Sequence, residues 1–229
     1  MNSWLLLNSG PGESASNMAL DEALLHSVSH WKKPALRFYG WTEPAATFGY
    51  FQKYSEVAET ILLRPLIRRP TGGGIVPHDA DWTYSLAFPP NHEWYSLKAV
   101  ESYRRVHEWI RDAFARLNVI SELAAESKKS APGQCFIGHE QSDVLWRGRK
   151  IAGAAQRRTR EGLLIQGSVQ PPPISLKRED WENAMRAVAE TDQRVVWEKL
   201  DSDSAESLER QAAELVRTKY SQDAFNQKR

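Results

Sequence analysis

The sequence predicts an α+β protein with a mixed, mostly antiparallel sheet flanked by helices. Short runs rich in β-branched and aromatic residues precede, follow and interrupt the helical patterns, which is typical of this fold class. Residues 96–117 carry apolar side chains at spacings of three and four, as an amphipathic helix does. A turn at Arg147-Gly148 separates two further strand-like runs, which favours a hairpin and therefore antiparallel pairing.

Strand-like and helical patterns alternate through the first half of the chain. We expect strands over 3–8, 35–41, 44–49, 65–69 and 82–88, and helices over 16–25, 55–61 and 96–117. Ser16 can cap the first helix, and Asp21 and Glu22 lie in its first turns, where acidic groups suit the helix dipole. We also expect the strand over 82–88 to pair with the strand over 65–69.

The second half adds a hairpin and two helical segments. We expect strands over 119–122, 142–146, 149–156 and 163–169, and helices over 178–190 and 204–220. The proline run 171–173 stops the last strand before the helices begin. We therefore predict a main domain over residues 1–175 and a C-terminal helical extension over 176–229 that packs on it.

Composition limits the class of protein. The 229 residues include 30 basic and 29 acidic side chains, so the net charge of +1 favours neither nucleic acid nor a membrane surface as a partner. The first residues are too short and too uncharged for a signal peptide, and no run of about 18 apolar residues occurs. The single cysteine excludes an internal disulfide and a multi-cysteine zinc site. We expect a soluble, cytoplasmic protein.

The loop that carries Thr71, Gly72, Gly73 and Gly74 after Arg68-Arg69-Pro70 is the most distinctive stretch. Glycines let a ligand approach the backbone, and successive N–H groups can face a carboxyl-like or phosphate-like group. Neighbouring arginines add permanently charged bidentate donors. The alternative is a hairpin turn with solvated arginines. The loop is neither a Walker loop nor a dinucleotide fingerprint, because the required spacings are missing.

Cys135 and Lys150 are a candidate catalytic pair. A thiol becomes a nucleophile as the thiolate, and a nearby ammonium group favours that form. The two residues belong to neighbouring parts of one predicted hairpin region. The alternative is a buried, inert cysteine with a lysine on the surface.

Two further groups leave alternatives open. His78-Asp79 could act as a metal pair or an acid–base pair, or it could cap a turn. The other histidines show no recurring ligand spacing, so we predict no metal site. The basic residues could dock an acidic partner or form a solvated face; they are Arg147, Arg149, Arg157, Arg158 and Arg160.

Seven segments together resemble the superfamily of lipoate–protein ligases, octanoyltransferases and biotin–protein ligases. They occur in the same order as in that superfamily: NMALDEA (17–23), RFYGW (37–41), GYFQ (49–52), RRPTGGG (68–74), HD (78–79), TYS (83–85) and GRKIAGAAQ (148–156). The resemblance covers roughly residues 1–175 and implies a biotin/lipoyl ligase-like catalytic domain.

The resemblance also implies a substrate and a product. In this superfamily the sheet cradles a medium-chain acyl group, the glycine loop covers the acyl or acyl-adenylate moiety, and the lysine matching Lys150 touches its carbonyl or phosphate. The product is an amide on a lysine of a lipoyl carrier domain, of the glycine cleavage H protein or dehydrogenase E2 type. The expected substrate-binding residues are Tyr39, Arg69, Thr71, Gly72, Gly73, Gly74, His78, Gly153 and Ala154.

Two chemistries share this framework. Octanoyltransferases pass octanoate from acyl carrier protein through a cysteine thioester and need no cofactor, whereas lipoate ligases use ATP and Mg²⁺ to form an acyl-adenylate. Cys135, fifteen positions before Lys150, and the Thr83-Tyr84-Ser85 segment resemble the cysteine-dependent octanoyltransferases. We therefore expect Cys135 and Lys150 to be catalytic.

Other features keep two alternatives open. The Gly72-Gly73-Gly74 triplet is at least as typical of ligases, and Gln166-Gly167 stands where relatives commonly carry His-Gly. An ATP-dependent lipoate ligase is the alternative enzyme. A non-catalytic module that holds a fatty acid or lipoyl group is the alternative from another class.

Overall fold

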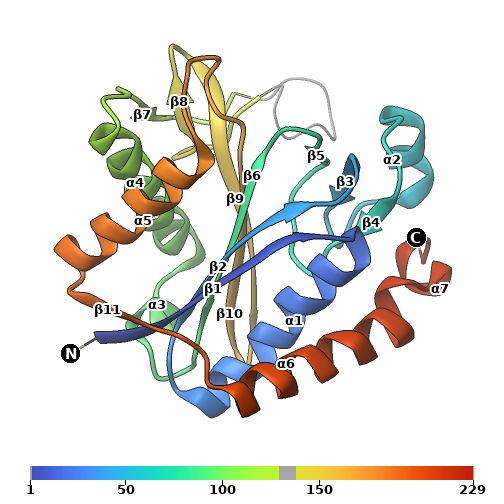
Figure 1. The fold of residues 1–229 in the computed structure, drawn as a ribbon. Helices are drawn as coiled ribbons and strands as arrows, with labels where there is room; N and C mark the ends of the chain where they lie inside the picture. The colour runs from blue at the N-terminus through green and yellow to red at the C-terminus, as the bar shows by residue number, and fades with distance from the viewer. Residues whose placement is uncertain (1, 129–137, 229) are drawn as a thin grey trace.

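An eight-stranded sheet forms the centre of the computed structural model, which describes residues 2–128 and 138–228 (Figure 1). The strand order is β11-β1-β2-β6-β10-β9-β8-β7. The two pairs that β1 makes are parallel, and the other described pairs of this sheet are antiparallel. The strands are β1 (Asn2–Gly12), β2 (Ala35–Trp41), β6 (Trp82–Phe88), β7 (Glu122–Leu123), β8 (Val144–Trp146), β9 (Arg149–Thr159), β10 (Gly162–Val169) and β11 (Val195–Glu198).

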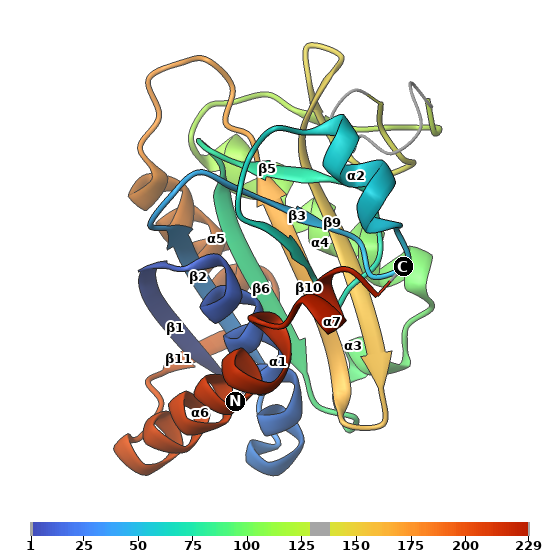
Figure 2. The same ribbon diagram turned by 90° about the vertical axis from the view of Figure 1, so that its right-hand side faces the viewer.

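A small sheet lies over the main one, in the order β4-β3-β5 (Figure 2). It consists of β3 (Ala45–Phe48), β4 (Leu66–Arg68) and β5 (Val76–His78), and helix α2 (Tyr54–Thr60) follows β3. Phe48 and Leu66 of the small sheet pack with Val57 of α2 in a separate apolar cluster. This cluster stabilises the small sheet, and the glycine loop connects β4 to β5.

Helices cover both faces of the main sheet (Figure 1). One face carries α4 (Ala99–Arg116) and α5 (Arg178–Asp192), and the other carries α1 (Ser14–Trp31) and α6 (Ser202–Leu215). Three short helical segments are α3 (Glu93–Ser96), the π-helical turn Val216–Tyr220 and α7 (Asp223–Asn226). None of the described helices is both long and apolar enough to span a membrane.

The spacing of apolar residues accounts for the position of α4. Its buried side chains recur every three or four residues and join the larger core cluster; they include Val106, Trp109, Ile110, Ala113 and Phe114. Trp4 of β1 and Trp181 of α5 are fully buried in the same cluster. The mixed α+β class with a mostly antiparallel sheet, as predicted from the sequence, is confirmed.

Two local predictions were wrong. Strand β6 pairs with β2 and β10, whereas β4 pairs with β3 in the small sheet. Every residue of β6 is buried, so this strand needs a neighbour on both edges and a layer on both faces. Helix α1 begins at Ser14, so Ser16 does not cap it and no acid lies in its first turn. Asp21 and Glu22 lie further along the helix, where both are buried and hydrogen-bonded to other elements.

The C-terminal segment contributes a strand as well as helices. Strand β11 pairs with β1 at the edge of the main sheet, and α5 covers a face of that sheet. The sequence patterns indicated only helices after residue 176, because the run Val195–Glu198 is short. The division of the chain at residue 175 remains a prediction.

Candidate functional site

A pocket of about 480 Å³, its open mouth included, lies between the main sheet and the small sheet. Strands β2, β6, β9 and β10 supply one wall, and β3, β5 and the glycine loop supply the other. The described lining residues are Met18, Tyr39, Thr47, Arg69, Gly73, Val76, His78, Thr83, Lys150, Gly153, Ala154, Ala155, Gln166, Gly167 and Ser168. Segments distant in sequence therefore meet at one cavity.

Lys150 lies in this pocket and is almost fully buried. Its Nζ is 2.8 Å from Oδ2 of Asp143, and the two side chains are 8% and 0% exposed. A buried ion pair needs further hydrogen bonds to offset the loss of water. Asp143 has them, since the Glu140 N–H donates to Oδ2 at 2.7 Å and the Tyr103 hydroxyl donates to Oδ1. The alternative of a surface lysine is thereby excluded.

Gly153 leaves room for the lysine. A Cβ atom built on Gly153 would lie 2.6 Å from Cε and 2.7 Å from Nζ of Lys150, and 3.2 Å from Oδ1 of Asp143. Contacts shorter than 3.0 Å force a shift, so a side chain at this position would displace the end of Lys150, which passes directly over Gly153. Gly153, expected from the resemblance to bind substrate, therefore lies directly against the lysine.

The half-buried Tyr103 and the buried His107, both on α4, lie close to the ion pair. Burial raises the pKa of Tyr103 well above its usual value, and the charge of Asp143 raises it further. Burial also lowers the pKa of His107 to about 4, and its Nδ1 donates to the carbonyl of Tyr103 at 2.8 Å. Near neutral pH Tyr103 is thus a protonated phenol that donates a hydrogen bond to Asp143, and His107 is uncharged.

The glycine loop is held in shape by Arg69 and by Gly49. Nε and Nη2 of Arg69 donate to the carbonyl of Gly72 at 3.0 and 2.5 Å. Gly73 has a φ of +87°, in the left-handed region that favours glycine. A Cβ on Gly49 would lie 1.9 Å from the carbonyl oxygen of Gly73, so the two backbones touch. The arginine therefore braces the loop from within.

Thr71 begins a buried hydrogen-bond network beneath the loop. Its hydroxyl donates to Oε1 of Gln166 at 2.7 Å, and Nε2 of Gln166 donates to Oδ2 of Asp21 at 2.7 Å. Asp21 also accepts from Nη1 of Arg37 at 2.6 Å and from the Tyr39 hydroxyl at 2.9 Å. Burial, with the nearby Asp21 charge, raises the pKa of Tyr39 well above its usual value, so it remains a donor.

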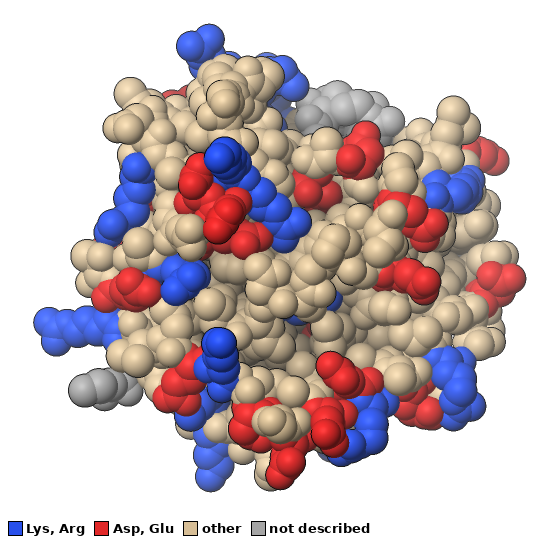
Figure 3. All heavy atoms as spheres, in the orientation of Figure 1, with Lys and Arg blue, Asp and Glu red and all other residues tan. Residues whose placement is uncertain are grey.

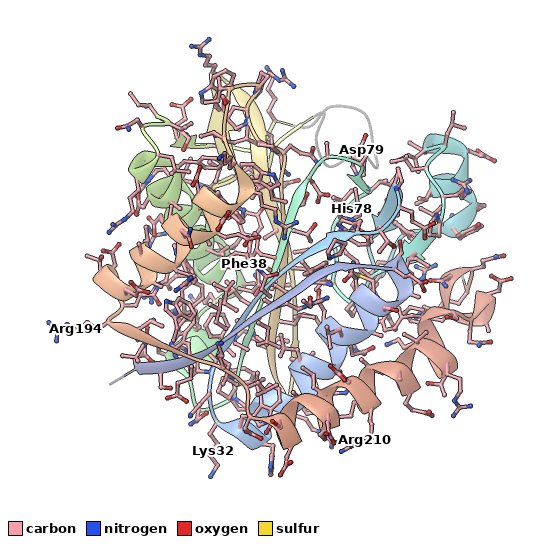
Figure 4. The ribbon with its side chains drawn as sticks, in the orientation of Figure 1. Lys32, Phe38, His78, Asp79, Arg194 and Arg210 are labelled. Carbon is pink, nitrogen blue, oxygen red and sulfur yellow. The ribbon has the colours of Figure 1, made fainter. Side chains whose placement is uncertain are left out.

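His78 pairs with Asp81, not with the adjacent acid that the sequence suggested. Its Nδ1 lies 2.8 Å from Oδ2 of Asp81, and its Nε2 lies 2.8 Å from the Thr47 hydroxyl. Asp79 is exposed (Figure 4 labels His78 and Asp79). The ring of Trp41 stacks on His78 at 3.9 Å between centroids. Residues 79–81 form the bend between β5 and β6, and that bend turns Asp81 back toward His78 while Asp79 faces solvent.

The pocket brings together most of the predicted site residues. Its described lining includes Tyr39, Arg69, Gly73, His78, Lys150, Gly153 and Ala154. Thr71, Gly72 and Gly74 belong to the adjoining loop. Cys135 lies outside the described residues, so its distance from Lys150 remains a prediction. On either side of this segment, Lys128 and His139 pair through two backbone hydrogen bonds of 2.8 and 3.1 Å.

Several polar residues of the site were missed. Asp143, Thr47 and Asp81 contact predicted site residues, but each looks like an ordinary strand or loop residue in the sequence. Gln166 was noted only as a departure from the His-Gly of relatives, and its hydrogen bond with Thr71 was not predicted. Tyr103 falls within the helix predicted over 96–117 and was given no role in the site. An acid before the first strand of a hairpin, with a lysine at the start of the return strand, was the available signal for Asp143.

Neither a metal-ligand cluster among the described residues nor a charge patch on the face drawn in Figure 3 marks a further site. No group of three or more His, Cys, Asp or Glu side chains there could hold a metal ion. On the face drawn in Figure 3, acidic and basic side chains are interspersed and form no large area of one sign. The predicted absence of a nucleic-acid partner remains a prediction.

Curated relatives of this chain are octanoyltransferases. The Octanoyltransferase LipM of Oceanobacillus iheyensis is 33% identical over 233 residues, which cover 96% of this chain and 83% of the relative. The Octanoyltransferase LipM of Halalkalibacterium halodurans is 35% identical over 182 residues, which cover 74% of this chain and 66% of the relative. The chain thus spans slightly less than two thirds of the second relative.

Solved structures share the fold at lower identity. A lipoate-protein ligase A bound with ATP superimposes with a TM-score of 0.79 at 22% identity, covering 99% of each chain. A bi-partite lipoate protein ligase of Thermoplasma acidophilum gives 0.73 at 21% identity, covering 99% of this chain and 96% of that one. The family model described as the lipoyl protein ligase A/B catalytic domain matches residues 13–217. The chain belongs to this family of lipoyl protein ligase A/B catalytic domains.

Proposed function

We propose that this chain transfers an octanoyl group, or a lipoyl group, to a specific lysine of a lipoyl carrier domain through a thioester on Cys135. The observation that carries the proposal is the 33% identity with an octanoyltransferase along 96% of the chain. The ligase structures, at 21 and 22% identity, support the fold alone. A pocket that combines small and apolar walls with one buried lysine agrees with an acyl substrate.

The proposed reaction has two acyl-transfer steps. The Cys135 thiolate attacks the thioester carbonyl of an octanoyl-carrier protein, and the carrier thiol leaves. The amine of the target lysine then attacks the enzyme thioester, so that an amide forms, the amine loses a proton and the cysteine thiolate leaves. The Lys150 ammonium group stabilises the thiolate and the oxyanion that develops in each step.

The remaining predicted site residues bind the acyl group in this proposal. Gly153 and Ala154 offer small surfaces against which an acyl chain can lie. Arg69 braces the loop of Gly72 and Gly73, and that loop covers the carbonyl end. In this proposal Tyr39 shapes the wall formed by the main sheet, and the opposite wall is shaped by Thr71, Gly74 and His78.

ATP-dependent lipoate ligation is the second candidate. The arginine-braced glycine loop is the feature that favours it, since such a loop suits the phosphate of an acyl-adenylate. In that reaction Lys150 would bind the adenylate, ATP and Mg²⁺ would be required, and Cys135 would have no chemical role. In the transferase reaction no cofactor is required.

A donor comparison tests the proposal. Purified protein is incubated with one lipoyl domain as acceptor, and with either octanoyl-acyl carrier protein or ATP, Mg²⁺ and free octanoate or lipoate. We expect acylation of the lipoyl domain from the carrier-protein donor alone, and its loss in Cys135→Ser. Pyrophosphate release that depends on the free acid and survives Cys135→Ala would instead establish the ligase. Binding of octanoate without acylation from either donor would favour the non-catalytic module.

The choice of carrier domain belongs to the same proposal. A lipoyl domain of a glycine cleavage H protein or of a dehydrogenase E2 subunit is the proposed acceptor, and acyl carrier protein is the proposed donor. The cytoplasmic location expected from the sequence stays a prediction.

A further inference from the structure

We propose that Asp143 and Tyr103 are positioning residues that hold the Lys150 amine as an ammonium ion directed into the pocket. The inference rests on the proposed function, because it assigns a reason for the position and charge of Lys150. Neither Asp143 nor Tyr103 is among the described lining residues, so both act through the lysine.

Asp143 is built to remain a carboxylate. It is fully buried, and it receives the Lys150 ammonium, the Glu140 N–H and the Tyr103 hydroxyl from three different segments. An unpaired carboxylate at this depth would be strongly destabilising, whereas three donors offset the loss of water. The pair therefore consists of two charged groups, and Lys150 is a cation when it faces the pocket.

Tyr103 fixes the orientation of that carboxylate from the other side of the sheet. It lies on α4, which is attached to β9 near the pocket. The Ser102 hydroxyl donates to Oε1 of Gln156 at 3.0 Å, and Nε2 of Gln156 donates to the carbonyl of Ala99 at 2.7 Å. The ring of His107 also packs on Tyr103 at 4.2 Å. The phenol therefore has a fixed position relative to β9, the strand that carries Lys150.

This arrangement defines what Lys150 does. An amine that is already protonated and paired cannot accept the proton of a thiol as a general base. It can stabilise a thiolate, an oxyanion or a phosphate by its charge and its hydrogen bonds. Lys150 is therefore a fixed cation that donates hydrogen bonds to developing negative charge, and the two positioning residues keep it charged and correctly placed.

Chemical labelling tests the ion pair without any assumption about the reaction. The folded protein is treated with limiting acetic N-hydroxysulfosuccinimide ester, which reacts with neutral amines, and acetylation of Lys150 is followed by peptide mass spectrometry. We expect Asp143→Asn to increase the labelling rate of Lys150 about tenfold, the size expected for one lost hydrogen bond between charged groups. Asp112→Asn, an acid of α4 paired with Arg111 on the surface, is the control and should leave the rate unchanged.

A double-mutant cycle tests whether Tyr103 acts through Lys150. Tyr103→Phe retains the ring and removes only the hydroxyl. We expect it to lower the single-turnover rate of octanoyl transfer about tenfold, with an unchanged KM and an unchanged fraction of active protein, and to lower it less than about twofold in a Lys150→Met background. Tyr95→Phe removes a matched phenol that donates to the Thr159 carbonyl at 2.9 Å, and should have no effect in either background.

The outcomes separate this inference from the proposed function. Unchanged Lys150 labelling in Asp143→Asn, or an equal effect of Tyr103→Phe in both backgrounds, overturns the positioning role. If wild-type protein acylates only from ATP and free acid, the proposed transferase function fails, and the same cycle is then measured on that reaction. Tenfold faster labelling together with a non-additive cycle supports the inference under either donor.

Discussion

Single side chains determine the charge inside the pocket. Lys150 lines the pocket and pairs at 2.8 Å with Asp143, which lies outside the described lining; Arg69 is the other charged residue of that lining. Gly153 permits this pairing, because any side chain there would occupy the space of the lysine. A glycine and an alanine in a strand interior usually weaken packing, so their presence in β9 has a local cause.

Gly153→Ala should therefore reduce activity more than stability. The new methyl group would displace Nζ of Lys150 from Asp143, and we expect octanoyl transfer to fall about tenfold or more, as for one lost hydrogen bond to a charged group. Turnover at saturating donor and thermal unfolding are measured together. Gly40→Ala is the control, since its Cβ would lie 3.1 Å from the flexible tip of Arg178 and would otherwise make ordinary contacts with Pro11, at 3.7 and 3.9 Å. Equal activity of Gly153→Ala and wild type would contradict the geometry.

His107 should make the protein less stable in mild acid. Its pKa is about 4 when folded, against 6.5 ordinarily, because burial disfavours the charged ring. Above pH 6.5 the histidine is neutral in both states and its contribution is fully present. As the pH falls from 6.5 to 4, the unfolded chain alone takes up the proton, so stability is lost; a shift of this size corresponds to about 3 kcal/mol.

The measurement is urea unfolding at pH 7.5 and at pH 4.5. We expect His107→Phe to lose about 2–3 kcal/mol less than wild type between these pH values, by linkage of proton uptake to unfolding. His30→Gln changes an exposed histidine and should retain the wild-type difference. The same pH dependence in His107→Phe and wild type would assign the acid sensitivity to other groups.

Among the elements, the C-terminal helix α7 secures the loop beside the pocket. The guanidinium of Arg68, fully buried, donates to the carbonyls of Tyr50 and Gln52 at 2.8 and 2.7 Å and to that of Asn226 at 3.0 Å. Tyr50 in turn donates its N–H to the Thr71 carbonyl at 2.8 Å. One arginine thus connects the C-terminal segment, the small sheet and the glycine loop.

Asn226→Ala should loosen this connection. Oδ1 of Asn226 accepts from the Arg68 N–H at 3.0 Å, and Nδ2 donates to the Tyr220 carbonyl at 2.9 Å. Loss of these bonds leaves a buried N–H without a partner, and we expect a destabilisation of about 2 kcal/mol, or roughly 4–8 °C in Tm. Gln227→Ala, at an exposed neighbour, is the control. Equal melting temperatures for Asn226→Ala and wild type would show that α7 does not hold the loop.

The predictability of each element depended on its length and on its partners. In the 18 residues of α4 the apolar side chains recur every three or four positions, which predicts a helix clearly. Strands β2 and β6 were recognised from their β-branched and aromatic runs. The pairing of β6 was wrong because a strand buried on both faces carries no signal for its neighbour. Strand β11 was missed because four residues between two helices give too short a pattern.

Prediction of the site from the sequence was also partial: the residues that line the pocket were found, but their hydrogen-bond partners were not. Residues identified through motifs, such as Arg69, His78 and Lys150, line one pocket. The residues that orient them were not found, because Asp143, Asp81 and Gln166 act through contacts made only after folding. Local motifs indicate which residues face a ligand, whereas hydrogen-bond partners from distant strands are set by the topology.

At the scale of the whole molecule, the C-terminal segment completes the core. Trp181 is fully buried and packs on Phe38 and Trp82, each with centroids 5.6 Å away. Strand β11 continues the sheet beyond β1. The predicted boundary at residue 175 thus separates segments that share one hydrophobic cluster.

A fragment of residues 1–175 should therefore fail to fold cooperatively. Removal of α5 exposes the face of the sheet around Phe38 and Trp82, and loss of a large buried aromatic alone destabilises a protein by about 3–5 kcal/mol. Circular dichroism and urea unfolding of the fragment and the full chain provide the comparison. A cooperative transition with the full chain's midpoint would show instead that residues 1–175 form an independent domain.

The central claim is that the acyl group passes through a thioester on Cys135. Intact-mass spectrometry after incubation with octanoyl-acyl carrier protein, without an acceptor domain, tests it most directly. We predict one octanoyl adduct on wild-type protein, removed by hydroxylamine, and none on Cys135→Ser. Absence of the adduct from wild type, or its persistence in Cys135→Ser, would contradict the claim.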